Sequence, residues 1–271
     1  MREEKQYNYL LRYVETLISK GKYTFSLEQV KKDFKHLSNR AIQVGLSRLA
    51  IRNKIVSVHR GFYVIVPSEY ASRGLLPVVS FIDSLMTYLK KPYYVSLLSA
   101  AAFHGAAHQQ PQEYFVMTDL PILRTKLIKG HKINFTAKTK MSPDGIISKK
   151  TETGYIKVSG PELTALDIVL FEKRIGGLNR VATLLDELLD EVDPEKLKAL
   201  LKKNIPTAFI QRLGYISDKI LKKKKIASAI REWIKNKKLL RVPLEAGGKR
   251  SGFPVDADWK IIINAEPESD L

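Results

Sequence analysis

The 271-residue sequence contains no cysteine, which excludes disulfide bridges, thiolate zinc sites, iron–sulfur clusters and a cysteine nucleophile. It has no hydrophobic run near the ~20 residues that a membrane helix needs. The charged first residues lack the apolar core of a signal peptide. The hydrophobic fraction of 44% and the charged fraction of 27% are typical of a globular chain. We therefore expect a cytoplasmic protein of one large or two modest domains, without a membrane partner.

Signature motifs of common enzyme classes are also missing, since the chain has no GxxxxGK[ST], GxSxG, HExxH or GxGxxG pattern. His104 and His108 have the spacing of two ligands on one helix face, but a glycine between them is expected to end the helix, and no third metal ligand is recognisable. Asp144, Glu152 and Lys157 resemble a metal-dependent nuclease set only in residue type, because the acidic-x-Lys spacing is absent. We expect no enzymatic activity, no cofactor and no resident metal.

Positive charge, by contrast, is abundant and clustered. The chain carries 46 lysines and arginines against 28 aspartates and glutamates, a net charge of +18. Residues 1–75 hold 14 basic and 6 acidic residues, residues 76–200 hold 16 and 14, and residues 201–241 hold 13 and 2. Clustered cations bind polyphosphates through counterion release, whereas a uniform spread would indicate only solubility. Two basic regions around a nearly neutral middle therefore indicate contact with nucleic acid.

Residues 1–75 have the pattern of a winged helix-turn-helix domain. Apolar residues at helical spacing and capping serines predict helices over 7–19, 26–34 and 38–53. Two β-rich runs follow, joined by a turn at 59–61, and predict a hairpin that would form the wing. The order of these elements is typical of a DNA-binding domain.

The third predicted helix has an apolar face and a polar face. Ile42, Leu46 and Leu49 fall together and should contact the other two helices. The opposite face offers side chains suited to base edges in a major groove. The predicted DNA-binding residues of this helix are Ser38, Asn39, Arg40, Gln43, Val44, Ser47 and Arg48. His59 and Arg60 are predicted to contact DNA from the wing; the alternatives are a solvated helix face or a winged helix that binds protein.

Residues 76–271 are predicted to form a larger mixed α/β domain with a helical bundle portion, which makes the whole chain α+β. Proline and glycine between 67 and 80 mark the boundary. The segments EYFVMTD, HKINFTAK and GYIKVS predict strands, and apolar periodicity from Ser159 onward predicts five helices. The final WKIIIN predicts a strand that could return to the sheet.

The second basic region, residues 201–241, lies on the last two predicted helices. Apolar positions occupy their inner faces, so the basic side chains should project outward. Lysine predominates there and suits contact with phosphate better than recognition of bases. The predicted DNA-backbone residues are Lys202, Lys203, Arg212, Lys219, Lys222, Lys223, Lys224, Lys225, Arg231, Lys235, Lys237 and Lys238. A solvated loop or a surface for an acidic partner protein is the alternative.

The chain resembles the AbiEi antitoxins of type IV toxin–antitoxin systems in five motifs that keep their order: YYVSLLSAAAFHG, SGPELTALDIVLF, GGLNRVATLLDEL, FIQRLGYISDKI and VPLEAGGKRSG…DWKIIIN. The resemblance runs over nearly the whole chain. It implies a bacterial or archaeal autorepressor with a role in phage defence, whose winged helix binds inverted repeats in double-stranded DNA upstream of its own operon. It also implies that the C-terminal domain contacts DNA through basic surface and counteracts a nucleotidyltransferase-like toxin, without need of a stable complex.

Two functions of other classes stay open. A one-component transcription regulator would sense a small ligand in its large domain, yet no pocket of converging polar groups is visible in the sequence. An enzyme acting on nucleic acid would need a carboxylate cluster around a metal ion, which the sequence does not supply.

Overall fold

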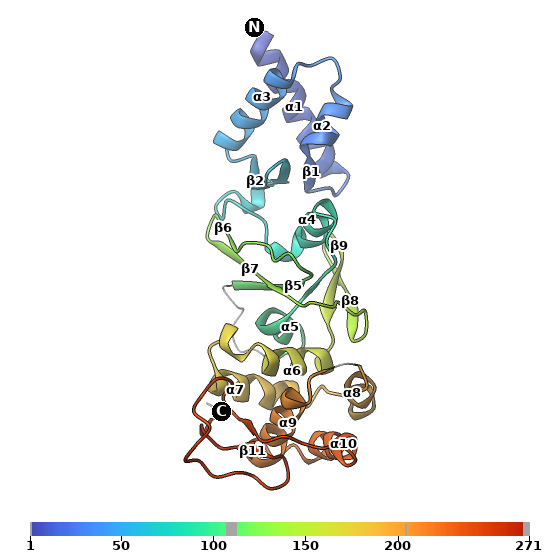
Figure 1. Ribbon diagram of the computed structural model, residues 1–271. Coiled ribbons are helices and arrows are strands. Elements are labelled where there is room, and N and C mark those ends of the chain that lie inside the picture. Colours follow the sequence, from blue (N-terminus) through green and yellow to red (C-terminus); the bar gives the residue numbers. More distant parts are fainter. Residues whose placement is uncertain (1, 107–112, 204, 268–271) are drawn as a thin grey trace. The chain divides into compact units, whose positions relative to one another are not determined.

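The computed structural model describes residues 2–106, 113–203 and 205–267, which form a mixed α+β protein (Figure 1). The chain divides into two compact units. The first unit consists of Met1–Tyr93, Thr118–Thr139 and Ser148–Lys157, and the second of Tyr94–Met117, Lys140–Ile147 and Val158–Leu271. None of the described helices is both long and apolar enough to cross a membrane.

The first unit begins with helices and a small sheet. The elements are α1 (Arg2–Ser19), β1 (Thr24–Ser26), α2 (Leu27–Asp33), α3 (Asn39–Ile51), β2 (Ile55–His59) and β3 (Phe62–Ile65). The strand order is β1-β3-β2, and both pairs are antiparallel. The three predicted helices and the predicted hairpin are thus present, whereas β1 was not predicted.

Local chemistry explains where α2 and α3 begin. Ser26 forms a capping box with Gln29: the Ser26 hydroxyl accepts the Gln29 N–H at 3.1 Å, and the Gln29 side chain accepts the Ser26 N–H at 2.7 Å. The hydroxyl of Ser38 accepts the N–H of Ala41 at 3.2 Å. Each serine thereby satisfies a backbone donor that the first turn of a helix leaves without a partner.

A single apolar core holds these elements together. Its buried members are Leu10, Val14, Phe25, Val30, Ile42, Leu46, Leu49, Ile55 and Ile65. Helix α1 approaches α3 closely at Gly45, where a Cβ atom would overlap the Leu10 side chain. This glycine therefore permits the close packing that fixes the inner face of α3 and leaves the opposite face exposed.

Helix α4 (Ile82–Tyr88) and a six-stranded sheet come next. The strands are β4 (Tyr93–Val95), β5 (Glu113–Thr118), β6 (Lys126–Ile128), β7 (His131–Ala137), β8 (Ile146–Thr151) and β9 (Gly154–Ser159), in the order β6-β7-β5-β4-β9-β8. Strands β4 and β9 are parallel, whereas β6 and β7 are antiparallel. The three strands that the sequence predicts here are β5, β7 and β9, and all three are confirmed.

Helices dominate the second unit. They are α5 (Leu97–Phe103), α6 (Pro161–Leu170), α7 (Leu178–Leu188), α8 (Pro194–Leu201), α9 (Thr207–Tyr215), its π-helical continuation η4 (Ile216–Ile220), and α10 (Lys224–Ile234). The five predicted helices are therefore confirmed. The last predicted strand is present as β11 (Ile261–Ile262), but it pairs in parallel with β10 (Val242–Pro243) and not with the large sheet, because the chain supplies that partner locally.

Trp259 is fully buried and closes the core of the second unit. Its ring packs so closely on Gly214 of α9 that a side chain at this position would overlap it. The indole N–H donates to Asp218 at 3.0 Å, which satisfies the polar atom of this buried side chain. Trp259 thereby fixes the C-terminal segment against α9 and η4.

Candidate nucleic-acid interface

The exposed face of α3 carries polar side chains on a helix with a fixed inner face. Arg40, Gln43 and Ser47 are exposed, and Val44 retains 37% of its surface. The positions between them, among them Ile42 and Leu46, are buried. This placement agrees with the sequence prediction for these four residues and gives a helical surface whose backbone cannot rotate without loss of the core.

Three other residues predicted to bind DNA from this helix are less available or placed at its end. Ser38 caps the helix, so its hydroxyl already has a donor. Asn39 is exposed in the first turn. Arg48 is half-buried and is engaged in an interaction within the protein. Among the residues predicted from the sequence to bind DNA through α3, Arg40 and Gln43 are therefore the long polar side chains that are exposed.

The turn of the β2–β3 hairpin is anchored to α4. The Tyr88 hydroxyl donates to the carbonyl of Arg60 at 3.0 Å, and Gly61 has a φ of +75° beside that hydroxyl. The His59 ring lies 6.2 Å from the Tyr88 ring, is only partly exposed, and has a buried Nδ1 without a hydrogen-bond partner among the described residues. Burial, followed by the charge of Lys126, lowers the pKa of His59. The structure thus places Arg60 at the exposed tip and His59 behind it.

Exposed cations on α2 were missed by the sequence analysis. Lys31 and Lys32 occupy the last turn of α2, and Lys35 follows in the segment that leads to α3. All three are exposed. Their position in the sequence could have indicated a role, because the first helix of a helix-turn-helix motif crosses the DNA backbone.

The second basic region separates into exposed and engaged side chains. Seven exposed lysines have no ion pair with the part of the chain that the structure describes: Lys202, Lys222, Lys224, Lys225, Lys235, Lys237 and Lys238. Lys203 is exposed as well and lies 3.4 Å from Asp144. Lys223 is half-buried and is bound by Asp190 at 2.8 Å and Asp186 at 3.4 Å.

Arg212 departs from the prediction, because it is only 6% exposed. Its Nε donates to the carbonyl of Pro243 at 2.9 Å, and its guanidinium lies 5.3 Å from the centre of the Phe209 ring. Burial lowers its pKa, an effect opposed by the charge of Glu172. Arg212 therefore ties α9 to β10 and does not belong to the exposed basic surface.

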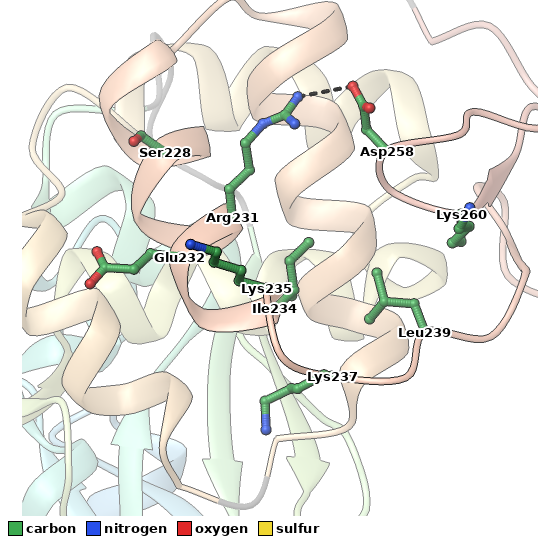
Figure 2. Close-up of a pocket in the computed structure, with 9 residues that line it drawn as sticks. All are labelled: Ser228, Arg231, Glu232, Ile234, Lys235, Lys237, Leu239, Asp258 and Lys260. Atoms are coloured by element: carbon green, nitrogen blue, oxygen red, sulfur yellow. Dashed lines mark hydrogen bonds and ion pairs between the residues drawn. The ribbon is translucent and has the colours of Figure 1, made fainter.

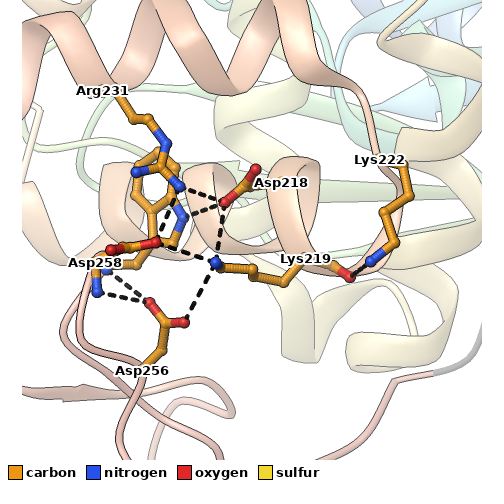
Figure 3. Close-up of polar contacts among 7 residues, drawn as sticks. Asp218, Lys219, Lys222, Arg231, Asp256 and Asp258 are labelled. Atoms are coloured by element: carbon orange, nitrogen blue, oxygen red, sulfur yellow. Dashed lines mark hydrogen bonds and ion pairs between the residues drawn. The ribbon is translucent and has the colours of Figure 1, made fainter.

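Lys219 and Arg231 are paired with a network of carboxylates formed by Asp218, Asp256 and Asp258 (Figure 3). Arg231 donates to Asp218 at 2.6 Å and Asp258 at 3.2 Å, and its guanidinium lies 4.9 Å from the Trp259 ring centre. Lys219 reaches Asp258 at 3.0 Å and Asp256 at 3.9 Å. Hydrogen bonds from Lys219 and then Arg231 lower the pKa of Asp258. These two cations are therefore largely neutralised before any ligand arrives.

No group of three histidine, aspartate or glutamate side chains able to hold a metal ion is found among the described residues. The Nε2 atom of His104 lies 2.7 Å from the carbonyl oxygen of Ser159, which gives this ring a structural partner. His108, the other half of the spaced pair, lies outside the described residues.

Comparison with solved structures gives a fold match to the RV2827C protein from Mycobacterium tuberculosis. The TM-score is 0.66 at 14% sequence identity, and the alignment covers 94% of this chain and 91% of that one. At this identity the likeness establishes the fold alone. No curated protein matches the sequence.

Comparison with family models gives a functional class. Residues 94–219 match the AbiEi antitoxin C-terminal domain. These residues extend from β4 into η4 and include Lys219, which contacts Asp258. Over this part of its length the chain is similar to the AbiEi antitoxin family.

Proposed function

We propose that the protein is a DNA-binding transcriptional autorepressor and antitoxin of a type IV toxin–antitoxin system. Residues 1–75 act as its winged-helix DNA-binding domain and residues 76–271 as its antitoxin domain. It binds operator repeats upstream of its own operon and counteracts a nucleotidyltransferase-like toxin. The family match supports the antitoxin role, and the observation that carries DNA binding is the exposed polar face of α3.

The dimensions and chemistry of α3 favour a major groove as its binding site. Thirteen residues make a helix roughly 20 Å long, and a major groove about 12 Å wide admits such a helix. Arg40 can donate two hydrogen bonds to a guanine edge, Gln43 can pair with adenine, and Val44 can contact a thymine methyl group. These three side chains project from the same exposed face.

The surrounding cations can hold the phosphate backbone on both sides of that groove. Lys31, Lys32 and Lys35 precede α3, and Arg60 lies at the tip of the hairpin. Such contacts fix orientation without reading sequence. The exposed lysines at the start of α10, Lys222, Lys224 and Lys225, supply a second grip on the backbone.

The experiment that tests this function uses the full-length protein and its own genomic neighbourhood. A footprint on the region upstream of its gene should show protected repeats, and a reporter driven by that region should be repressed. Co-expression with the adjacent gene should restore growth that the adjacent gene alone arrests. An unprotected upstream region would overturn the autorepressor role, and unrelieved growth arrest would overturn the proposed pairing with that gene.

A further inference from the structure

A hollow of about 650 Å³ lies at the carboxyl end of α10 (Figure 2). Its wall combines the last turns of α10 with the segment that follows and with the chain just before β11. Two apolar side chains, Ile234 and Leu239, belong to this wall, and Leu240 beside it is 71% exposed. The hollow therefore offers apolar surface within a charged rim.

The charges around the hollow are not equally available. Arg231 is paired with Asp258 at 3.2 Å, and Glu232 is paired with Lys198 at 2.6 Å. The remaining charged side chains are Lys235, Lys237 and Lys260, which are exposed and have no carboxylate partner among the described residues. Lys237 also lies 4.0 Å from the centre of the Trp233 ring. The hollow thus presents three positive charges without a carboxylate partner among the described residues.

The backbone places one of these lysines at some cost. Lys260 has a φ of +54°, in the left-handed region that residues with a Cβ seldom adopt. Its carbonyl accepts the N–H of Val242 at 3.0 Å, a bond that holds this conformation next to β11.

We propose that this hollow docks a segment of a partner protein in which apolar side chains are flanked by carboxylates. The carboxylates pair with Lys235, Lys237 and Lys260, and the apolar side chains cover the half-buried Leu239, since Ile234 is only 7% exposed. A duplex backbone fits less well, because its surface is a continuous row of charged phosphates and offers no apolar side chain to cover this wall.

The sequence predicts DNA-backbone contact for Lys235 and Lys237, and the present proposal assigns these two residues to the partner protein instead. The docking site is otherwise separate from the DNA contacts of the proposed function. It uses none of the exposed residues of α3 and none of the lysines at the start of α10. Loss of operator binding would therefore leave it intact, and loss of peptide binding would leave operator binding intact. The two proposals fail separately.

The probe is the fluorescein-labelled peptide DEDELLEDED, titrated with full-length protein and followed by anisotropy at physiological salt. The triple variant Lys235→Glu, Lys237→Glu, Lys260→Glu should bind it at least about tenfold more weakly, a change of about 1.4 kcal/mol. The matched control Lys222→Glu, Lys224→Glu, Lys225→Glu changes net charge equally at the other end of α10. It should stay within about twofold of the parent.

Two further measurements test the apolar part of the site. The peptide DEDESSEDED should bind about tenfold more weakly than the leucine peptide. The variant Leu239→Asn, checked for folding by circular dichroism, should lose most of that difference between the two peptides. Equal losses in both triple variants, or equal binding of the two peptides, would overturn the proposal. Tighter binding of labelled oligothymidylate than of the leucine peptide, with the same dependence on Lys235 and Lys237, would assign the hollow to a nucleic-acid strand instead.

Discussion

The two basic regions of this protein differ in how their charge is balanced. Arg40 and Gln43 lie on an exposed helix face, and Arg40 has no ion-pair partner among the described residues. In the second region, Lys219, Lys223 and Arg231 are each held by two or more aspartates. Residues 201–241 therefore offer a polyanion fewer cations than their formal charge implies. The charge that a ligand meets is the formal charge of a segment minus the charge that is already paired within the protein.

The largest expected effect concerns Trp259, whose indole N–H binds Asp218 in the carboxylate network. Replacement by alanine removes a fully buried ring and the hydrogen bond to Asp218. We expect the free energy of unfolding to fall by about 3–5 kcal/mol, measured by denaturant titration and circular dichroism. Trp233→Ala, at a half-buried tryptophan that carries Lys237 on its ring, is the control and should cost less. Equal losses in the two variants would contradict this role for Trp259.

The role of the exposed face of α3 can be tested by substituting Arg40 and Gln43 with alanine. The double alanine variant should keep its fold, because both side chains are exposed, and should weaken specific operator binding by about 1–3 kcal/mol for each base that is no longer read. A titration at fixed salt with operator and scrambled duplex measures the effect. Arg12→Ala removes an exposed cation from α1 and serves as the control. If the double variant binds operator as tightly as the parent, α3 is not the reading helix.

The paired and unpaired cations of the second region can be compared directly. Substitution of Lys222, Lys224 and Lys225 by alanine should weaken binding to operator and scrambled duplex by similar factors. It should also flatten the log–log salt dependence by about 0.9 for each phosphate that is no longer neutralised. Substitution of the paired Lys219 and Lys223 should change that slope less per residue removed. An equal change per residue would show that internal pairing does not withhold charge from DNA.

The smallest expected effect is a loss of stability in acid that traces to Asp218 and Asp258. Burial would raise the pKa of Asp218, but hydrogen bonds from Trp259 and Arg231 outweigh it and lower the pKa; the pKa of Asp258 is lowered too. A lowered folded-state pKa stabilises the protein above the usual aspartate value of about 3.9, and this contribution is lost as the pH falls through the folded-state pKa. Because Asp258 is half exposed, we expect no more than about 1 kcal/mol from it.

Denaturant titrations from pH 7 to pH 2 measure that loss. The double variant Asp218→Asn, Asp258→Asn should show a shallower decline in the free energy of unfolding than the parent. Glu69→Gln, at an exposed residue of the first unit, provides the matched control and should follow the parent curve. If the stability of the parent declines no more steeply than that of the double variant, Asp218 and Asp258 do not contribute to the loss of stability in acid.

Features that depend on neighbouring residues in the sequence were predicted well. The exposed positions of α3 follow from the spacing of Ile42, Leu46 and Leu49, and its start follows from Ser38. Strand β1 was missed because its three residues are too few to show a period, and it forms only by pairing with β3. The local pattern of apolar and polar residues thus suffices to predict the buried and exposed faces of a single helix.

Features that depend on distant residues were not predictable from local pattern. Arg212 was placed on the surface because its segment is basic, yet its partner is the carbonyl of Pro243. The charge of residues 201–241 was overestimated because Asp186, Asp190, Asp256 and Asp258 come from other parts of the chain. Which aspartate meets which lysine is decided by the packing of helices, which no short window of sequence contains.

The position of Trp259 near the carboxyl end has a consequence for the order of events during synthesis. Translation adds about 5–20 residues per second, so the segment with Asp256, Asp258 and Trp259 leaves the ribosome a few seconds after α10. Throughout that interval Arg231 has only Asp218 among its partners, and the groove on Gly214 has no ring to fill it. The nascent chain is therefore more basic than the finished protein. A product truncated before Asp256 would lack two of the carboxylates that pair with Lys219 and Arg231.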